Sequence, residues 1–275
     1  MAKSKLRQVV SMKAIDCHVH LNSYNDSKGS IDDSLVELLQ SMGGCDIDAS
    51  IVISSYKVNK DRPSTDKIIG ITEKHDNLAV VGGYSIENHT IEDFRNYRKW
   101  LLENKLKGIK IYCGYEHYFP TDKKYQKIYD LCTEFEVPLM VHCGDTFASD
   151  AKLKYAHPLN IDEVATDNPE LKIVICHLGN PWILDCQEVL YKNRNVYADI
   201  SGLFFGPVSD HYEQCLITKI KELLSYTSSP HHLLFGSDWP ISDVRLCIRL
   251  VNKLGLSRKD CDLLMFGNTQ KVFKV

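Results

Sequence analysis

The 275-residue sequence predicts one domain, 1–275, folded as a single (β/α)8 barrel, the TIM-barrel architecture. Eight short apolar runs rich in Val and Ile begin 25 to 37 residues apart, the length that a strand and its crossover helix need. No linker or shift in composition divides the chain, and no glycine-rich phosphate-binding motif follows any run. The spacing therefore favours a closed barrel over an open nucleotide-binding sheet.

The eight apolar runs are the predicted strands. They begin at Ala14, Ala49, Leu78, Leu106, Pro138, Leu171, Val196 and Leu233. The segments between them carry apolar residues at three- and four-residue spacing, as amphipathic helices do. Thr90 and Asp93 have the spacing of a capping box before one such segment, and residues 32–44 begin with two aspartates and end with two glycines. Residues 146–158 are mostly polar and show no clear period.

Composition and charge are those of an ordinary globular protein. Hydrophobic residues make up 44% and charged residues 25% of the chain, and 33 basic against 36 acidic side chains give a net charge of −3. We therefore expect a small-molecule substrate and neither nucleic acid nor a membrane as partner, while a homo-oligomer is possible.

The ten cysteines are spread singly, without any C-x-x-C pair, and several lie inside apolar runs. The N-terminus has no apolar run of a secretory signal, and no stretch approaches 18 apolar residues. These features predict a cytoplasmic protein with reduced thiols. Alternation along the strands predicts that Cys143 and Cys176 face the helices, which disfavours a thiol nucleophile.

Metal-competent side chains stand at the ends of four predicted strands. His18 and His20 end the first strand on one face, His142 ends the fifth, His177 the sixth and Asp238 the eighth. All strands of a barrel open their carboxyl ends on one face, so these five groups should converge there. The alternative, polar groups satisfied separately at the edge of the core, needs a partner for each. The pattern favours a metal site.

The chain resembles the amidohydrolase superfamily, in the branch that includes aminocarboxymuconate-semialdehyde decarboxylase. The matching segments are IDCHVH, GIKIY, VPLMVHCGD, VICHLG, VYADISG, LLFGSDWP and FGNTQKVF, which extend from residue 15 to 273. The resemblance implies that His18, His20, His142 and Asp238 hold a single metal ion, usually zinc, and that His177 lies beside the metal's water or substrate. In such a site Asp238 shuttles the proton of a water that the metal activates.

Lys110 in GIKIY should point into the barrel, with Ile109 and Ile111 facing the helices. Three roles are open for it: a carboxylated bridge between two metals, an anchor for a substrate carboxylate, or a structural ion pair, for instance with Asp16. We expect one metal per chain and an unmodified ammonium. Lys110 and Tyr112 are the candidate substrate-binding residues.

The leading functional hypothesis is a metal-dependent hydrolase of a small amide, lactone or ester. The alternative is a zinc-dependent nonoxidative decarboxylase of an aromatic or unsaturated carboxylic acid, and a third reading is a non-catalytic metal-binding barrel. A decarboxylase must hold a carboxylate, yet no arginine directly follows a predicted strand, and Lys57 and Lys110 are the evident cations near the mouth. That observation favours hydrolysis.

Overall fold

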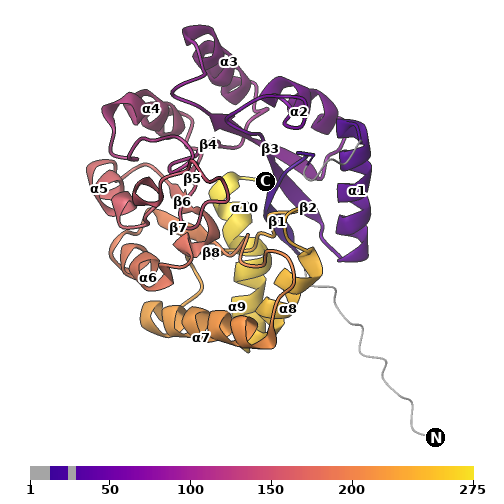
Figure 1. Ribbon diagram of the computed structural model, residues 1–275, viewed down its shortest axis with the longest axis vertical. Helices are drawn as coiled ribbons and strands as arrows, with labels where there is room; N and C mark the ends of the chain where they lie inside the picture. The colour runs from indigo at the N-terminus through magenta and orange to yellow at the C-terminus, as the bar shows by residue number, and fades with distance from the viewer. Residues whose placement is uncertain (1–12, 24–28) are drawn as a thin grey trace, which may run out of the picture.

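The structure, a computed structural model, describes residues 13–23 and 29–275 and has the predicted barrel. Eight parallel strands pair in the order β1 to β8 and alternate with helices around a ring (Figure 1). Every strand falls within a predicted apolar run. They are β1 (Ile15–Val19), β2 (Ala49–Ile53), β3 (Leu78–Tyr84), β4 (Ile109–Ile111), β5 (Leu139–Val141), β6 (Ile173–Ile175), β7 (Val196–Asp199) and β8 (Leu233–Leu234).

Helices surround the barrel, except the last one, which lies within the ring in Figure 1. They are α1 (Ile31–Gly44), α2 (Thr65–Thr72), α3 (Ile91–Leu102), α4 (Gln126–Glu134), α5 (Asn160–Asp167), α6 (Ile183–Lys192), α7 (Asp210–Thr227), α8 (Val244–Leu254), α9 (Arg258–Asp262) and α10 (Asn268–Phe273). The capping box at the start of α3 is present: the Thr90 hydroxyl accepts from the Asp93 N–H, and the Asp93 carboxylate accepts from the Thr90 N–H. Residues 146–158 contain only a short 3₁₀ turn, Leu153–Tyr155.

Contacts between β8 and β1 bring the two ends of the sheet together. The Cys17 N–H donates to the Phe235 carbonyl at 2.9 Å, and the Asp238 N–H donates to the His18 carbonyl at 2.8 Å. A further bridge joins Val19 to Trp239. Closure of the barrel therefore places Asp238 directly beside the histidines of the first strand.

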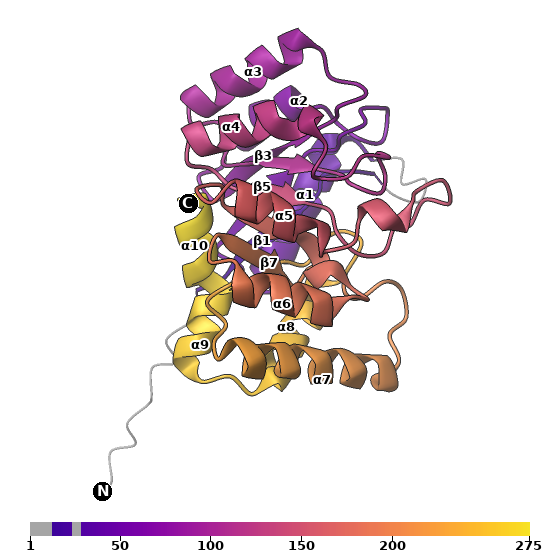
Figure 2. The ribbon, with the colours of Figure 1, turned by 90° about the vertical axis from the view of Figure 1, so that its left-hand side faces the viewer.

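The barrel has an apolar interior below its mouth. Residues from β1, β2, β3, β5, β6, β7 and β8 form one buried cluster there, and Val272 and Phe273 of α10 join it. Figure 2 shows α10 at the end of the barrel away from the loops that follow the strands. As predicted, Ile109 and Ile111 pack in the outer core between sheet and helices, whereas Lys110 between them faces the interior.

The predicted orientation of the thiols is correct for Cys143 and wrong for Cys176. Cys143 packs in the outer core, but Cys176 belongs to the interior cluster. Alternation in β6 runs on through Cys176, and His177 then reaches the barrel mouth because its backbone turns into the left-handed region, with φ of 61°. The sequence pattern alone does not reveal this turn.

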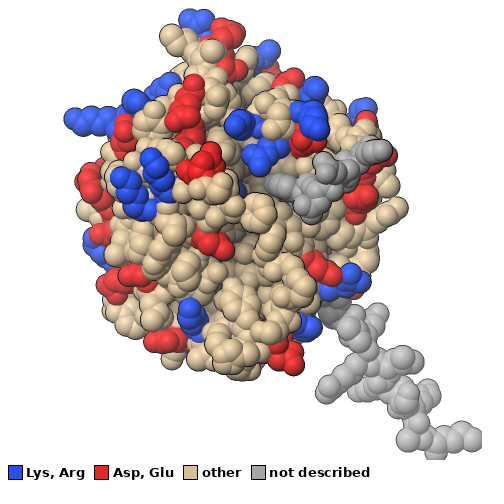
Figure 3. All heavy atoms as spheres, in the orientation of Figure 1, with Lys and Arg blue, Asp and Glu red and all other residues tan. Residues whose placement is uncertain are grey.

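On the face of the molecule drawn in Figure 3, acidic and basic side chains are interspersed around the periphery, and the centre is largely uncharged. Among the helices of the described residues, none combines the length and apolar character needed to cross a bilayer.

Candidate metal and active site

A cavity of about 370 Å³ opens at the carboxyl ends of the strands, within the size range of small-molecule sites. Six of the seven predicted site residues contribute to its lining, together with aromatic and polar side chains from the loops. The lining is His20, Asn22, Ser55, Tyr56, Arg62, Lys110, Tyr112, Tyr115, His142, Asp145, Thr146, Phe147, Ala148, His177, Gly202, Phe205, Asp238 and Ile241. His18 is fully buried beneath this surface.

His18, His20 and Asp238 form the tightest metal-competent group, with their ligand atoms all within 4.8 Å of one another. The Asp238 Oδ1 atom lies 3.3 Å from Nε2 of His20 and 3.6 Å from Nε2 of His18. Within the described part of the chain, this buried oxygen has no hydrogen bond of good geometry. An unsatisfied carboxylate oxygen facing two imidazole nitrogens is the arrangement that a cation would complete.

His177 lies beside His18, and His142 lies beside His177. The ring centroids of His18 and His177 are 4.9 Å apart, and those of His142 and His177 are 5.2 Å apart. The structure therefore brings all five groups to one mouth, but His142 lies outside the tight group of three.

Backbone carbonyls orient two of the imidazoles. His20 Nδ1 lies 2.8 Å from the Ile53 carbonyl, and His142 Nε2 lies 3.0 Å from the Asp145 carbonyl. A carbonyl oxygen only accepts hydrogen bonds, so each of these nitrogens carries the proton. The opposite nitrogens, Nε2 of His20 and Nδ1 of His142, keep the lone pair that a metal ligand requires.

The electrostatics of the group match this requirement. Burial lowers the pKa of His18 to about 3 and also lowers the pKa values of His20 and His142, which keeps all three imidazoles neutral. Burial would raise the pKa of Asp238, but its contact with His20 and the neighbouring His18 and His177 bring it below its usual range. Neutral imidazoles and an ionised carboxylate are the protonation states in which these side chains bind metals.

A second close group contains His18, Cys176 and His177. Burial raises the pKa of the Cys176 thiol well above its usual range, so the sulfur stays protonated. Because thiolates rather than thiols bind metals, this group fits a metal less well than the group with Asp238.

Lys110 and Tyr112 both line the cavity, as expected of substrate-binding residues. The Lys110 Nζ atom lies 2.8 Å from Nε2 of His18 and 4.8 Å from the centroid of the Tyr112 ring. The suggested ion pair with Asp16 is not formed: the Asp16 carboxylate accepts from the Ser237 N–H and hydroxyl instead. The Tyr112 hydroxyl donates to the Ser54 carbonyl at 2.7 Å, which fixes the ring against the cavity wall.

Arg62 is a cavity residue that the sequence analysis missed. It lies nine positions after β2, but hydrogen bonds between Asn59 and Arg62 in both directions fold the loop back towards the mouth. Lys57, the cation expected there, does not line the cavity. The prediction that Lys57 and Lys110 are the cations near the mouth is therefore correct for Lys110, wrong for Lys57 and incomplete without Arg62, because it considered only residues at or directly after a strand.

Aromatic side chains from several loops form much of the cavity wall. The Tyr56 ring lies 4.8 Å from that of Tyr112 and 6.2 Å from that of Tyr115, measured between centroids. At the rim, the rings of Phe147 and Phe205 are 5.1 Å apart and largely exposed. Such walls suit a flat or apolar substrate.

Asp199, the last residue of β7, and Ser201, two positions later, were also missed. Both are fully buried, and both contact His18. An aspartate that ends an apolar run was the signal that identified Asp238, and the segment VYADIS carries the same signal at Asp199.

The sequence profile of the family described as Amidohydrolase matches residues 90–275. No curated protein matches the sequence.

Solved structures with the same fold include enzymes of two reaction types. A 5-carboxyvanillate decarboxylase from Sphingomonas paucimobilis has a TM-score of 0.71 at 11% identity, covering 96% of this chain and 100% of its own. A probable 2-pyrone-4,6-dicarboxylic acid hydrolase from Acinetobacter baumannii has a TM-score of 0.69 at 13% identity, with coverage of 95% and 99%. A 5-carboxyvanillate decarboxylase from Novosphingobium aromaticivorans, solved with manganese, has a TM-score of 0.66 at 14% identity, with coverage of 87% and 80%.

Proposed function

The protein belongs to the amidohydrolase family, and from that starting point we propose that it is a metal-dependent hydrolase of a small amide, lactone or ester. The observation that carries the proposal is the contact of an ionised Asp238 with two neutral imidazoles, His18 and His20, at a substrate-sized cavity. A carboxylate placed there can accept the proton of an attacking water molecule and pass it to the leaving group.

We propose that His18, His20, His142 and Asp238 hold one divalent metal per chain, with zinc as our choice. Imidazole nitrogen and carboxylate oxygen suit Zn²⁺, and the manganese in one related structure shows that the fold accepts another divalent ion. When bound, such a metal polarises a carbonyl oxygen and makes hydroxide available at neutral pH.

The remaining cavity residues bind and orient the substrate. His177 lines the cavity and hydrogen-bonds the substrate near the reacting atom, which makes it and Asp238 the catalytic residues of the proposal. Arg62 and Lys110 supply positive charge for an anionic group. The rings of Tyr56, Tyr112 and Tyr115 offer flat surfaces against which an unsaturated ring can pack. A small, planar carboxylic acid derivative fits these features together.

A second candidate is nonoxidative decarboxylation of an aromatic or unsaturated carboxylic acid. Arg62 in the cavity favours it, because this reaction needs a cation that holds the carboxylate until carbon dioxide leaves. Related structures include decarboxylases and a probable hydrolase, so both reactions occur on this fold.

One experiment separates the two reactions. Purified protein is analysed for metal, reconstituted with Zn²⁺ or Mn²⁺, and incubated with planar lactones, amides, esters and aromatic carboxylic acids, with products identified by mass. A gain of 18 mass units in the product of a lactone, or in the summed masses of the two products of an amide or ester, marks hydrolysis. A loss of 44 mass units marks decarboxylation. Decarboxylation alone would make the second candidate the function, and a metal-free protein without turnover on the whole panel would contradict both.

We further propose a cytoplasmic protein that acts on a small molecule, without nucleic acid or membrane as partner. All ten cysteines are free thiols, seven of them buried, which suits a reducing compartment. A homo-oligomer remains compatible with this proposal.

A further inference from the structure

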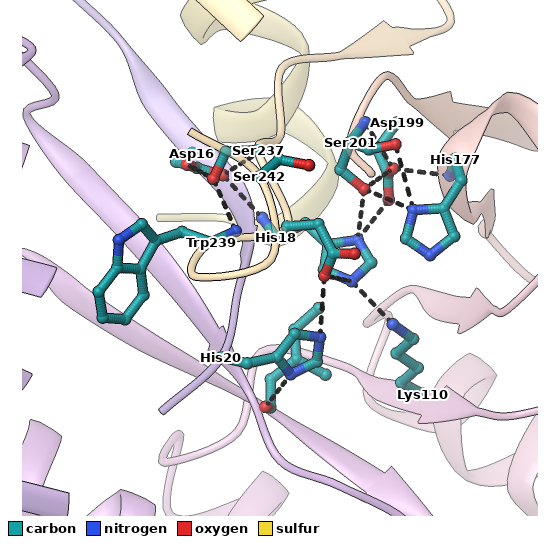
Figure 4. Close-up of polar contacts among 12 residues, drawn as sticks. Asp16, His18, His20, Lys110, His177, Asp199, Ser201, Ser237, Trp239 and Ser242 are labelled. Carbon is teal, nitrogen blue, oxygen red and sulfur yellow. Dashed lines mark hydrogen bonds and ion pairs between the residues drawn. The ribbon is translucent and has the colours of Figure 1, made fainter. Parts of the chain in front are cut away.

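Asp199 uses its two carboxylate oxygens differently. Oδ2 lies 2.9 Å from Nδ1 of His18. Oδ1 accepts three hydrogen bonds: from the His177 N–H at 2.9 Å, the Ser201 N–H at 3.1 Å and the Ser201 hydroxyl at 2.5 Å. Figure 4 shows the carboxylate between the two histidines. One oxygen is thus committed to the backbone and the serine, and the other to a single imidazole.

Ser201 extends this network to the second histidine. Because its hydroxyl proton goes to Asp199, its oxygen is free to accept, and Nδ1 of His177 lies 2.9 Å away. The Ser201 carbonyl also lies 3.2 Å from the same nitrogen. Both oxygens accept there, so Nδ1 of His177 carries the proton and Nε2 keeps its lone pair.

We propose that Asp199 is a positioning residue that sets the tautomer and ring orientation of His18 directly, and those of His177 through Ser201. With the proton of His18 on Nδ1, its Nε2 lone pair faces Asp238 and Lys110. One buried carboxylate therefore sets the protonated nitrogen of two imidazoles, that of His18 in β1 and that of His177 after β6. The tautomers follow from the contacts alone, whereas metal binding by His18 rests on the proposed function.

The Asp199→Asn variant tests the positioning role because it keeps the size of the side chain but replaces one accepting oxygen with a donating amide nitrogen. Three donors face Oδ1, so the amide oxygen stays there and the amide nitrogen faces His18. Nδ1 of His18 also lies 3.0 Å from the Ser201 hydroxyl oxygen, but the amide at Asp199 places a donor where its main acceptor stood. We therefore expect Nδ1 to accept from the amide and its proton to move to Nε2. Lys110, which donates to that nitrogen, has a long flexible side chain and is the group that can turn away.

The experiment uses full-length, metal-free protein labelled with ¹⁵N at histidine, and two-bond ¹H–¹⁵N correlation spectra report the protonated nitrogen of each ring. Signals are assigned with His18→Gln and His177→Gln proteins. In the wild type we expect the proton on Nδ1 of both rings; in Asp199→Asn we expect it on Nε2 of His18 and still on Nδ1 of His177. Zinc affinity, measured by chelator competition, should fall about 10–100-fold in the variant.

Two serine variants complete the test. Ser201→Ala should lower kcat with little change in KM, because the Ser201 carbonyl keeps the His177 tautomer while the ring loses its hydroxyl contact. Ser50→Ala is the control: Ser50 is buried in β2, and its hydroxyl has no hydrogen bond within the described residues. It should change neither spectrum nor kcat.

A wild-type His18 protonated at Nε2 would overturn the proposal without any variant, even if Asp199→Asn did not fold. So would a folded Asp199→Asn protein with the wild-type His18 tautomer. Correct tautomers without zinc binding would contradict the proposed function and leave the positioning role of Asp199 standing.

Discussion

The ammonium nitrogen of Lys110 lies 2.8 Å from Nε2 of His18, the nitrogen that also faces Asp238. Lys110 is 1% exposed and comes from β4, on the other side of the barrel mouth from β1. Its positive charge therefore occupies the region where the proposed metal ligands converge. This contact makes Lys110 the residue that decides between one metal and two.

Replacing Lys110 with methionine should leave metal stoichiometry at about one per chain and should not weaken zinc binding. The reason is that the ammonium competes with a cation for the His18 lone pair and repels it. Binding of anionic ligands should weaken, since the variant removes a buried positive charge from the cavity. Metal analysis after exhaustive dialysis, together with titration of a planar carboxylate, measures both effects. A wild-type protein with two metals that retains one or none in Lys110→Met would show that Lys110 is a carboxylated bridge.

His177→Asn should retain near-stoichiometric metal and lose about 10²–10⁴-fold in kcat, the usual contribution of a positioned acid or base. His177 lines the cavity and lies beside His18 but is not a member of the group of His18, His20 and Asp238, so its loss leaves that group intact. Metal content and steady-state kinetics on the best substrate of the panel test the expectation. A purified His177→Asn protein without bound metal would show that His177 is a metal ligand.

Arg62→Ala should raise KM for anionic substrates at least tenfold, because a cation in contact with a carboxylate contributes roughly 1.5–3 kcal/mol. Lys57→Ala is the matched control, a cation from the same loop that does not line the cavity. The comparison needs KM for one charged substrate and for its neutral methyl ester or amide. Equal effects of the two variants would mean that Arg62 acts through general charge rather than contact.

Metal affinity should change little between pH 8 and pH 6. Burial lowers the pKa of His18 to about 3 and lowers those of His20 and His142, while the pKa of Asp238 is also below its usual range. Each ligand thus keeps its metal-binding form as the pH falls through 6.5, where ordinary imidazoles become protonated and lose affinity about tenfold per ring and pH unit. Chelator competition at constant ionic strength measures the affinity at each pH. A steep loss of metal affinity between pH 7 and pH 6 would contradict this expectation.

The barrel and the five converging groups could be predicted because they depend on periodic signals. Strand spacing predicted all eight strands, and a polar residue ending an apolar run identified His142, His177 and Asp238. Closure of β8 on β1, which sets Asp238 beside His18, follows from the same architecture.

What the sequence could not predict depends on loop geometry and on breaks in alternation. Arg62 reaches the cavity through a turn in which its backbone pairs with that of Asn59. The alternating pattern of the strands gives no information about such a turn. Cys176 was placed on the wrong face because His177 enters the mouth by a left-handed backbone rather than by alternation. Asp199 was overlooked because its partners, His18 and Ser201, become visible only once the strands are side by side.

The Cα atom of Gly202 packs closely against the side chains of His177 and Asp238. Gly202 follows β7 with φ of +63°, and a Cβ built on it would lie 2.6 Å from Nδ1 of His177 and 3.0 Å from Oδ2 of Asp238. Gly202→Ala should therefore displace both side chains that we propose to be catalytic and lower kcat by about 10²-fold, the effect of a misplacement near 1 Å.

Gly255 supplies the control for backbone strain. It ends α8 with φ of +72°, and a Cβ there would meet nothing within 4 Å. Alanine at either position costs about 1–2 kcal/mol of stability because of the left-handed backbone, but only Gly202→Ala should reduce turnover. Thermal unfolding and kcat of the two variants, measured side by side, separate strain from contact. Equal turnover in the two variants at equal loss of stability would mean that His177 and Asp238 tolerate displacement, and the catalytic roles proposed for them would then be wrong.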